Sequence, residues 1–554
     1  MRGIIALILF FCLCVVSCNA VLITEFCPDP YTYNDEDEYI VLSGSGPLDG
    51  FTVSDGKSGF RFPPGASVQG QITITRNAKS FEKTHGKRPD FEWIDNSPTV
   101  PNVINGNTLR MANGRDVLML YENGKLVQSV AWPDDVIARD GQVHYLDNGI
   151  WDRRVLMLGQ SRLQPSTFQN VTVTTFVSPD CSLEVFSSVV DRASDELLVN
   201  VYEFSSSNLS TSLIEARKRG VDVVVLVEGG PVGGISPEEK MEIFRMNQSG
   251  IPVFEMAAPT GGHAPYRYDH AKYLVVDNRA VLLTSENFKA SGFPPGGKSA
   301  NRGWGVYLEN TDLAGYFSGV FHTDAGGYTI VPIYGSPGPS ESASSTEYEA
   351  DFSPATFNNA VVTPVLAPDT SNQITVLVDS ATISVEIEQA YITNESATEL
   401  NPYLAAAINA SRRGVQVQVL LDSYWYNVED TKDNDEMVAL INRIAVNEHL
   451  PLEARCANLE TNGIEKIHNK GVIVDDRKVL VSSINWNSNS PTFNREAGVI
   501  IEHPGVASYF HEVFMDDWNP AVKSPRQQVD YLKIAAVIAV FCLLCILYYR
   551  KNRR

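Results

Sequence analysis

Basic residues are scarce in this chain. Lys and Arg number 44 against 66 Asp and Glu in 554 residues, which gives a formal net charge of -22 at pH 7. Four of the basic residues lie within the last five positions, so the rest of the chain is more acidic still. A surface that is basic throughout, as in proteins that coat nucleic acids, is therefore excluded.

Cysteine is also sparse, and most of it lies near the ends. Five of the eight cysteines fall in the two terminal segments, which leaves Cys27, Cys181 and Cys456 in the body of the chain. Three cysteines allow at most one disulfide, and none of their spacings is that of a zinc site. The hydrophobic fraction of 44% is ordinary for a globular protein, and the length suits roughly three or four domains.

Long apolar runs occur only at the two ends. A basic residue, an apolar run and small residues follow one another in residues 1–20, the order of a secretory signal peptide. Residues 531–549 are long and apolar enough for a transmembrane helix, and the basic tail 550–554 follows directly. We therefore expect a single-pass protein of the cell membrane whose large domain lies outside the cytoplasm. The alternatives are a lipid-attachment site at Cys18 and a buried C-terminal helix.

Residues 21–135 alternate between short apolar segments and turn residues, as in EYIVLSG, GFTVSDG and QITITRN. The segments DVLMLYE and KLVQSVAW are separated by Asn-Gly at 123–124, a two-residue hairpin signal. The pattern predicts an all-β sandwich, followed by a connector over residues 136–178. LITEFCPDP, DEYIVLSGSGPLDGFTVSDG and FRFPPGASV resemble the immunoglobulin-like lamin-tail domain, which implies a binding or spacer module.

The rest of the chain repeats one pattern. LLVNVYEF, a helix ending in ARKRG and the strand VDVVVLVE correspond to AYITNES, a helix ending in ASRRG and the strand VQVQVLLD. Further on, NRGWGV matches NREAGV, and YFSGVFHTD matches YFHEVFMDD. Alternating strands and helices predict α/β lobes over 179–330 and 359–522, joined by a flexible linker over 331–358. A fused duplication of this kind would hold a complete catalytic unit in one chain.

Each lobe carries one copy of an unusual motif, HAKYLVVDNRAVLLTSEN in the first and HNKGVIVDDRKVLVSSIN in the second. On an extended strand, alternate side chains share a face, so a histidine and a lysine project together. A turn and a returning strand then bring a serine and an asparagine to the same face. These residues are His270, Lys272, Ser285 and Asn287 in the first copy, and His468, Lys470, Ser483 and Asn485 in the second.

Two such hairpins, placed face to face, would form a pocket suited to a phosphate group. Lysines and neutral donors stabilise the charge of a trigonal-bipyramidal transition state. One histidine attacks phosphorus to give a phosphohistidine, and the other protonates the leaving oxygen and later deprotonates the incoming hydroxyl. Because this chemistry requires neither, we expect no metal ion and no cofactor.

The doubled H-x-K-x4-D-x6-(G/S/T)-S-x-N motif resembles that of the phospholipase D superfamily, which contains phospholipases, phospholipid synthases and nucleases. The resemblance covers about residues 180–520 and implies two fused α/β lobes that form a pseudo-dimer. It implies catalytic roles for the histidines and lysines, and substrate contacts for the serines and asparagines. The motif aspartates, Asp277 and Asp475, belong to the same catalytic motif, but their expected place in the turns favours a structural role.

In this superfamily an acidic residue downstream orients each motif histidine. Glu496 fits that role for His468, whereas Gly303 stands at the matching position for His270. The carboxylates of Asp269 and Glu309 are alternatives for the first lobe. With a carboxylate expected on one side only, we expect His468 to be the nucleophile and His270 the general acid and base.

The sequence therefore predicts an exported, membrane-tethered phosphodiesterase or phosphatidyltransferase. Phospholipid is the preferred substrate, because an anchor would hold the site near a bilayer and an acidic body would repel polynucleotides. The alternatives are an extracellular nuclease with a local basic groove, and a surface binding protein whose lobes have lost activity, which only Gly303 favours. The aromatic segment SYWYN at 423–427 could line the pocket and stack on a base or contact lipid, but packing in the core or at the rim is the favoured interpretation.

Overall fold

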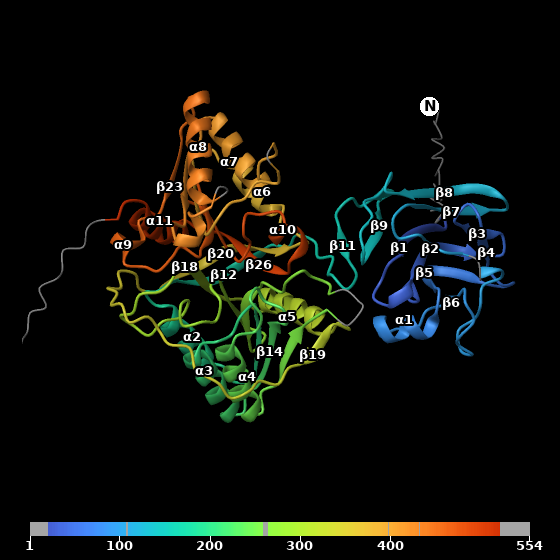
Figure 1. Cartoon of the computed structure of the whole chain (residues 1–554), viewed down its shortest axis with the longest axis horizontal. Coiled ribbons are helices and arrows are strands. Elements are labelled where there is room, and N and C mark those ends of the chain that lie inside the picture. The colour runs from blue at the N-terminus through green and yellow to red at the C-terminus, as the bar shows by residue number, and fades with distance from the viewer. Residues whose placement is uncertain (1–19, 107–108, 259–263, 397, 431–432, 521–554) are drawn as a thin grey trace, which may run out of the picture.

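The N-terminal region of the computed structural model is built from two sheets that share one core. The structure describes residues 20–106, 109–258, 264–396, 398–430 and 433–520. Phe26 and Ile40 of one sheet pack in the same cluster as Leu120 and Val130 of the other, so the sheets form a sandwich. Figure 1 shows this sandwich at one end of the long axis of the molecule.

The larger sheet of the sandwich has the order β10-β9-β1-β2-β5-β6, with β11 also paired to β9, and the smaller has the order β4-β3-β7-β8. Asn123 and Gly124, both at positive φ, form the predicted turn between β7 and β8. The elements are β1 (Leu22–Cys27), β2 (Tyr39–Pro47), β3 (Phe51–Ser54), β4 (Gly59–Arg61), β5 (Ser67–Thr75), α1 (Ala78–His85), β6 (Phe91–Glu92), β7 (Asp116–Glu122), β8 (Lys125–Trp132), β9 (Gln142–Asp147), β10 (Ile150–Trp151) and β11 (Leu156–Met157).

The structure differs from the sequence interpretation over residues 136–178, which we expected to be a connector. β9 pairs with β1 through Phe26 and His144, so the sandwich continues to Met157. This pairing covers the second edge of β1, which would otherwise expose unpaired backbone groups. The next strand, β12 (Phe168–Ser178), already belongs to the following sheet.

A fifteen-stranded sheet carries the two α/β lobes. Its order is β19-β15-β14-β13-β16-β17-β18-β12-β20-β26-β25-β24-β21-β22-β23, so seven strands on either side of the β12–β20 contact appear in matching order and β19 is added at one edge. The first-lobe elements are α2 (Ser182–Asp191), β13 (Glu196–Val201), α3 (Ser207–Lys218), β14 (Asp222–Glu228), α4 (Pro237–Gln248), β15 (Val253–Met256), β16 (Lys272–Val276), β17 (Ala280–Thr284), β18 (Gly303–Glu309), α5 (Thr311–Ala325) and β19 (Ile330–Pro332).

The second lobe repeats these elements. They are β20 (Ala355–Ala367), α6 (Gln373–Asp379), β21 (Ser384–Gln389), α7 (Pro402–Arg412), β22 (Gln416–Leu421), α8 (Asn434–Glu448), β23 (Leu452–Cys456), α9 (Leu459–Asn462), β24 (Lys470–Val474), β25 (Lys478–Ser482), α10 (Ser490–Phe493), β26 (Glu496–Glu502) and α11 (Pro504–Trp518). The duplication predicted from the repeated pattern is therefore a duplication of structure, and the chain is a mixed α/β protein with two lobes.

Three apolar cores hold the lobes together. The helices α2, α3 and α4 cover one outer face, and α6, α7 and α8 cover the other, as Figure 1 shows. Between them, Phe317 of α5 and Phe510 of α11 share one central cluster with residues of both halves of the sheet. Trp304 of the first lobe stacks on Phe510 of the second at 4.7 Å between ring centroids. The lobes thus share a core, as the two halves of a pseudo-dimer would.

The segment 331–358, expected to be a flexible linker, lies against the first lobe. Ser336 donates its backbone N–H to the carbonyl of Lys240, and Tyr348 donates to the carbonyl of Gly297. The Tyr348 ring is buried, and its hydroxyl donates to Asp180. These contacts fix the path of the segment because each satisfies a polar group against the lobe surface.

The predicted location in the cell membrane is corrected by the structure. Within the described residues, no helix is both long and apolar enough to cross a membrane. The expected single-pass location in the cell membrane is therefore contradicted. Most of the segment 1–20 and all of 531–549, on which that expectation rested, lie outside the described residues.

Candidate active site

The two motif hairpins form as the sequence predicts. β16 and β17 pair through Tyr273 and Leu283, and β24 and β25 pair through Val472 and Leu480. Each motif lysine begins the first strand of its hairpin and donates to the carbonyl of the histidine two residues earlier. The distance from Lys272 Nζ to the His270 carbonyl oxygen is 2.8 Å, and that from Lys470 Nζ to the His468 carbonyl oxygen is 2.6 Å.

Each motif histidine is held by the backbone of the other lobe. The His270 N–H donates to the carbonyl of Arg495 at 2.8 Å, and the His468 N–H donates to the carbonyl of Arg302 at 2.9 Å. The two lobes therefore exchange short extended segments, and the exchange brings both histidines to the seam between them.

Two buried guanidinium groups fix this seam. Arg302 contacts Asp180 of its own lobe at 2.7 Å and Asp517 at the end of α11 at 2.8 Å. Arg495 correspondingly contacts Asp324 at the end of α5 at 2.8 Å and Asp369 at 3.1 Å. All six side chains are buried or nearly so, so the ion pairs hold the two lobes in one orientation. Sequence analysis noted the repeated residues but assigned them no role.

The carboxylate partner of His270 comes from the second lobe. Glu496 Oε2 lies 2.8 Å from His270 Nδ1, and Glu496 also accepts hydrogen bonds from Ser483, Ser490 and Asn494. This corrects the prediction that Glu496 orients His468. The prediction failed because it assumed that the histidine and the acid of one lobe meet, whereas the residues just before each motif strand pair with the other lobe.

The acidic residue nearest to His468 is Glu286, which sequence analysis did not single out. Its Oε2 lies 3.3 Å from His468 Nδ1 and accepts a hydrogen bond from Asn301 at 3.0 Å. Asp269 and Glu309 were the alternatives for the partner of His270, and Glu496 takes that place instead. Asp269 is buried behind the strand, where its backbone N–H binds Glu228, and Glu309 lies at the far end of β18.

The charges in this cluster influence one another strongly. Burial lowers the pKa of Lys272 to about 8, although Glu496 opposes the shift. Burial lowers the pKa of Lys470 well below its ordinary value, and the Lys272 ammonium lowers it further. Burial also lowers the pKa of His468 well below 6.5, and Lys470, Lys466 and Lys272 lower it further. His468 is thus neutral at pH 7 when no anion is bound.

His270 and Glu496 form a better matched pair. Burial lowers the pKa of His270, but the Glu496 carboxylate opposes that shift. Burial would raise the pKa of Glu496, yet His270 and Lys272 keep it below the ordinary value. Glu496 is therefore ionised, and His270 donates Nδ1–H to it, which leaves Nε2 with a free lone pair. His270 and His468 keep 12% and 16% of their side chains exposed, so solvent and ligands can reach the rings.

The motif serines are positioned inside the protein. Ser483 Oγ donates to Glu496, and Ser285 Oγ accepts the backbone N–H of Trp304 at 3.1 Å. Both serines are fully buried, which differs from their predicted role of touching substrate. Asn287 donates to Glu203 at 2.8 Å and is partly exposed, while Asn485 is mostly buried. Among the residues that the structure describes, neither asparagine has a hydrogen-bond partner for its side-chain oxygen.

Comparison with known proteins gives a family for this arrangement. The family described as "Cardiolipin synthase, PLD-like domain" matches residues 187–325 and 374–518, about half of the chain. The chain belongs to this PLD-like family. It is a PLD-like enzyme, and the matched residues cover both lobes.

Similarity to individual proteins is more distant. No curated protein matches the sequence. Nuc from Salmonella typhimurium, a phospholipase D family member, is 22% identical over 31% of this chain and 99% of its own, with a TM-score of 0.25. Phosphatidylserine synthase from Haemophilus influenzae Rd KW20 is 14% identical over 67% of this chain and 94% of its own, with a TM-score of 0.46. Similarity at this level does not identify a substrate.

The motif aspartates of the PLD-like enzyme lie in the hairpin turns. Asp277 and Asp475 have φ values of 50° and 55°, and each lies about 16 Å along its strand from the motif lysine. Asp277 accepts the backbone N–H groups of residues 194–196, and Asp475 accepts those of residues 382–384. These bonds fasten the start of β13 or β21 to the turn. The geometry agrees with a structural role and separates both aspartates from the histidines.

Replacing Asp277 by asparagine is expected to lower the free energy of unfolding by about 2 kcal/mol, because a charged acceptor of several backbone N–H groups is lost. Turnover per folded molecule should stay within about threefold of wild type. Urea denaturation and active-site titration measure the two quantities. Asp195→Asn, which removes an exposed ion pair with Arg279 and weakens an exposed hydrogen bond from Ser194 Oγ, is the control. A large loss of turnover without a loss of stability would instead give Asp277 a chemical role.

Two further carboxylates support the backbone in front of the histidines. Glu228, at the end of β14, accepts the N–H of Asp269 at 2.6 Å, and Asp422, after β22, accepts the N–H of Ile467 at 2.7 Å. Sequence analysis missed both residues. The signal was their matching position, because each is the last residue of one of the paired apolar segments VDVVVLVE and VQVQVLLD.

The aromatic segment 423–427 is less buried than expected. Trp425 is 57% exposed and Tyr426 is 47% exposed, so these two rings do not pack in the core. Tyr426 accepts a hydrogen bond from Lys466 at 3.1 Å, and the Lys466 charge acts on both Glu286 and His468. These aromatic rings therefore lie on the rim of the candidate site.

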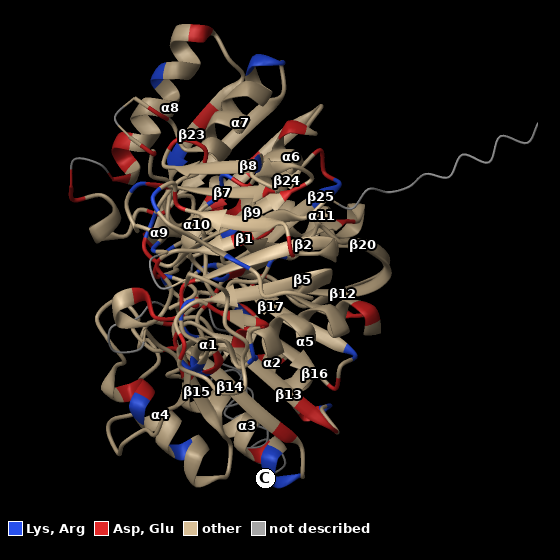
Figure 2. Ribbon diagram, turned by 90° about the vertical axis from the view of Figure 1, so that its right-hand side faces the viewer, with Lys and Arg blue, Asp and Glu red and all other residues tan. Residues whose placement is uncertain are grey.

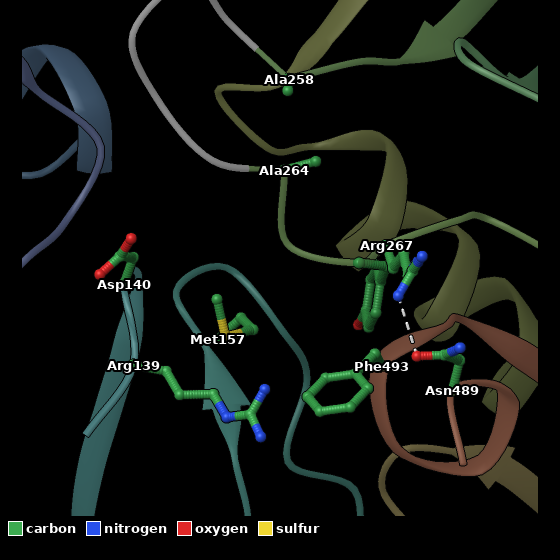
Figure 3. Close-up of a pocket in the computed structure, with 9 residues that line it drawn as sticks. Arg139, Asp140, Met157, Ala258, Ala264, Arg267, Asn489 and Phe493 are labelled. Carbon is green, nitrogen blue, oxygen red and sulfur yellow. Dashed lines mark hydrogen bonds between the residues drawn. The ribbon is translucent and has the colours of Figure 1, made fainter. Parts of the chain in front are cut away.

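A cavity of about 690 Å³ lies where the sandwich meets both lobes. Figure 3 shows Arg139 reaching toward Phe493, and Arg267 joined to Asn489 by a hydrogen bond of 2.9 Å. Arg267 and Phe493 each precede a residue of the candidate site by three positions, so this cavity flanks the site. In the view of Figure 2, basic and acidic residues are interspersed along the described chain, and the basic ones form no continuous stripe.

Among the described residues, three side chains are placed so that they could share a metal ion. Ligand atoms of Glu386, Asp476 and His511 lie within 4.8 Å of one another. Glu386 is on β21, Asp476 is in the second hairpin turn and His511 is on α11, so the group is separate from the histidine pair.

Proposed function

We propose that this PLD-like enzyme cleaves or exchanges a phosphodiester through a covalent phosphohistidine. The observation that carries the proposal is the cluster at the lobe seam, where two histidines, two buried lysines and two carboxylates influence one another. The lysines supply positive charge for the phosphate oxygens in a site of low dielectric constant.

In the first half-reaction, Nε2 of His270 attacks phosphorus, and the bond from phosphorus to the leaving oxygen breaks. His468, protonated once the anionic substrate is bound, transfers its Nε2 proton to that oxygen. The second half-reaction reverses these roles. His468 takes a proton from water or an alcohol, whose oxygen attacks phosphorus, and the P–N bond electrons return to His270.

The assignment of roles follows from the carboxylates. Attack places positive charge on the nucleophilic imidazole, so the nucleophile is the ring that contacts an ionised carboxylate directly. The sequence argument assigned this role to His468 because it placed Glu496 there. Because Glu496 contacts His270 instead, we assign the role of nucleophile to His270.

Phosphatidyl compounds are the first substrate class to test. The family description names a cardiolipin synthase, and the acidic body of the chain disfavours polynucleotides. A nuclease is the second candidate, favoured by exposed Trp425 and Tyr426 beside Lys466, since aromatic faces stack on bases. Gly303 no longer supports an inactive binding protein, because Glu286 supplies a carboxylate in that lobe. We also propose that the sandwich is a lamin-tail-like spacer or binding module.

The full chain, incubated in EDTA with radiolabelled phospholipid and separately with single-stranded DNA, separates these candidates. We expect release or exchange of the lipid headgroup in EDTA, with an acid-labile and alkali-stable phosphoryl label on the protein. Turnover of DNA alone would select the nuclease. No turnover of either substrate and no label would contradict a phosphohistidine enzyme.

The alkaline limb of the pH profile is expected near pH 8, because the Lys272 ammonium loses its proton there and its positive charge leaves the site. Lys272→Arg keeps its charge at high pH. Its rate should be lower overall, but its decline should begin at a pH at least about one unit higher. The measurement is kcat/KM for bis(p-nitrophenyl) phosphate between pH 6 and 10. Identical alkaline limbs in the two proteins would exclude Lys272 as their cause.

A further inference from the structure

The two lobes place their acidic residues at different positions of the repeat. Glu496 begins β26, and Gly303 begins β18 at the matching place, each directly after a seam arginine. Just after the second strand of each hairpin, the acidic residue is in the first lobe instead. Glu286 stands between Ser285 and Asn287, whereas the matching residue between Ser483 and Asn485 is Ile484.

The packing around Gly303 explains why the acidic residues of the two lobes stand at different positions. A Cβ atom added to Gly303 would lie 2.4 Å from Glu286 Oε1 and 2.5 Å from Glu286 Cγ. Glu286 therefore fills the volume into which a side chain at position 303 would project. In the second lobe, Ile484 is packed in the apolar core under the outer helices, and Glu496 fills the corresponding volume.

The Glu286 carboxylate lies next to the ring of His468. It is buried, and its Oε2 accepts from Asn301 at 3.0 Å and lies 3.3 Å from His468 Nδ1. Its Oε1 and His468 Nδ1 have no hydrogen-bond partner within the described residues. A slight movement of the ring would let His468 Nδ1–H donate to Oε2, 3.3 Å away, and would give the buried ring nitrogen a partner.

We infer that Glu286 is the positioning residue for His468, and that Gly303 is required because it leaves room for Glu286. The inference rests on the proposed function of His468 as acid and base. Glu286 contacts neither substrate nor the reacting phosphorus; it orients the ring and stabilises its protonated form. The two lobes thus supply the same chemical group from different places in the repeat, the residues just after β17 in one and the first residue of β26 in the other.

Leaving-group dependence tests this role. His468 must protonate an alkoxide leaving group but need not protonate p-nitrophenolate. Glu286→Gln is therefore expected to lower kcat/KM, which reports only the first half-reaction, about 10- to 100-fold for an alkyl phosphodiester and less than about threefold for bis(p-nitrophenyl) phosphate. An equal loss for both substrates would indicate a merely structural role and would overturn the inference.

Combined variants test the steric part. Gly303→Ala should lower alkyl phosphodiester turnover by about tenfold or more by displacing Glu286, and should cause no further loss when added to Glu286→Ala. Glu286→Ala combined with Gly303→Glu should recover at least about tenfold over Glu286→Ala alone. Gly319→Ala on α5, where an added Cβ meets nothing within 4 Å, is the matched control. Independent, multiplicative losses at 286 and 303, with no recovery, would contradict the inference.

A measurement without turnover keeps the two proposals distinguishable. In protein with ¹⁵N-labelled histidine, Glu286→Gln should lower the pKa of the His468 ring by about one unit or more and leave that of His270 unchanged. If no phosphodiester is turned over yet the His468 shift is observed, the proposed function fails and the assignment of Glu286 stands. An unchanged His468 titration would reject the assignment.

Discussion

Replacing His270 by alanine is expected to lower turnover of any phosphodiester by at least about 10⁴-fold and to abolish the phosphoryl label on the protein. The variant loses the atom that attacks phosphorus, and no other group can take its place because Lys272 is bound to a backbone carbonyl. The variant should still fold, since the His270 ring is partly exposed and its main contact is with Glu496. Rapid quenching with labelled substrate measures both quantities.

His468→Asn gives a different expected result. Without the acid and base, a substrate with a good leaving group should still phosphorylate His270, but water is not activated, so the label should accumulate. His322→Asn, an exposed histidine on α5, is the control and should match wild type. Accumulation of label in His270→Ala, with none in His468→Asn, would show that the two roles are the other way round.

Arg495→Met is expected to lower the free energy of unfolding by about 3–5 kcal/mol. The substitution leaves the Asp324 and Asp369 carboxylates buried without their cation, and desolvated carboxylates are costly. It should also reduce activity, because the Arg495 carbonyl holds the His270 backbone and the strand would shift. Urea denaturation of the full chain, followed by circular dichroism, measures the loss.

The control for this effect is Arg477→Met, which removes an ion pair between exposed side chains at the second hairpin. Its effect should be within about 0.5 kcal/mol of wild type. Arg495→Lys should be nearly as destabilising as Arg495→Met, because an ammonium cannot bridge two carboxylates with the geometry of a guanidinium. A loss below about 1 kcal/mol in Arg495→Met would mean that apolar packing alone holds the seam.

The repeat in the sequence predicted much of the architecture. The matched NRGWGV and NREAGV segments contain Arg302 and Arg495, and the matched YFSGVFHTD and YFHEVFMDD segments end in Asp324 and Asp517. These four residues form the buried pairs of the seam. The pattern therefore marked the residues, but pairing within a lobe and pairing across lobes give the same repeat. Only the three-dimensional arrangement distinguishes them.

The hairpins were predictable in more detail than the acids. Alternation fixes which side of a strand a residue occupies, so the common face of His270 and Lys272 follows from sequence. The partner of a histidine depends on which strands of the other lobe lie nearby, which no local rule specifies. Glu286 was missed for this reason. By analogy with Glu496, the acidic residue of the first lobe was expected at position 303.

The N-terminal boundary shows a further limit of local patterns. The Asn-Gly turn at 123–124 was correctly predicted, but β9 was not expected, although QVHYLD is a short strand-like segment. Its assignment to the sandwich depends on the open edge of β1, more than a hundred residues earlier, and that pairing is a long-range property.

The exchange of carboxylates and backbone segments between the lobes has a consequence for inheritance. A gene fragment that encodes only one lobe, left by an early stop codon or moved into another protein, would not encode a working histidine. The carboxylate and the backbone carbonyl that hold each motif histidine come from the other lobe. Changes in the two halves are selected together, because a replacement of Glu496 acts on His270 and a replacement of Glu286 acts on His468.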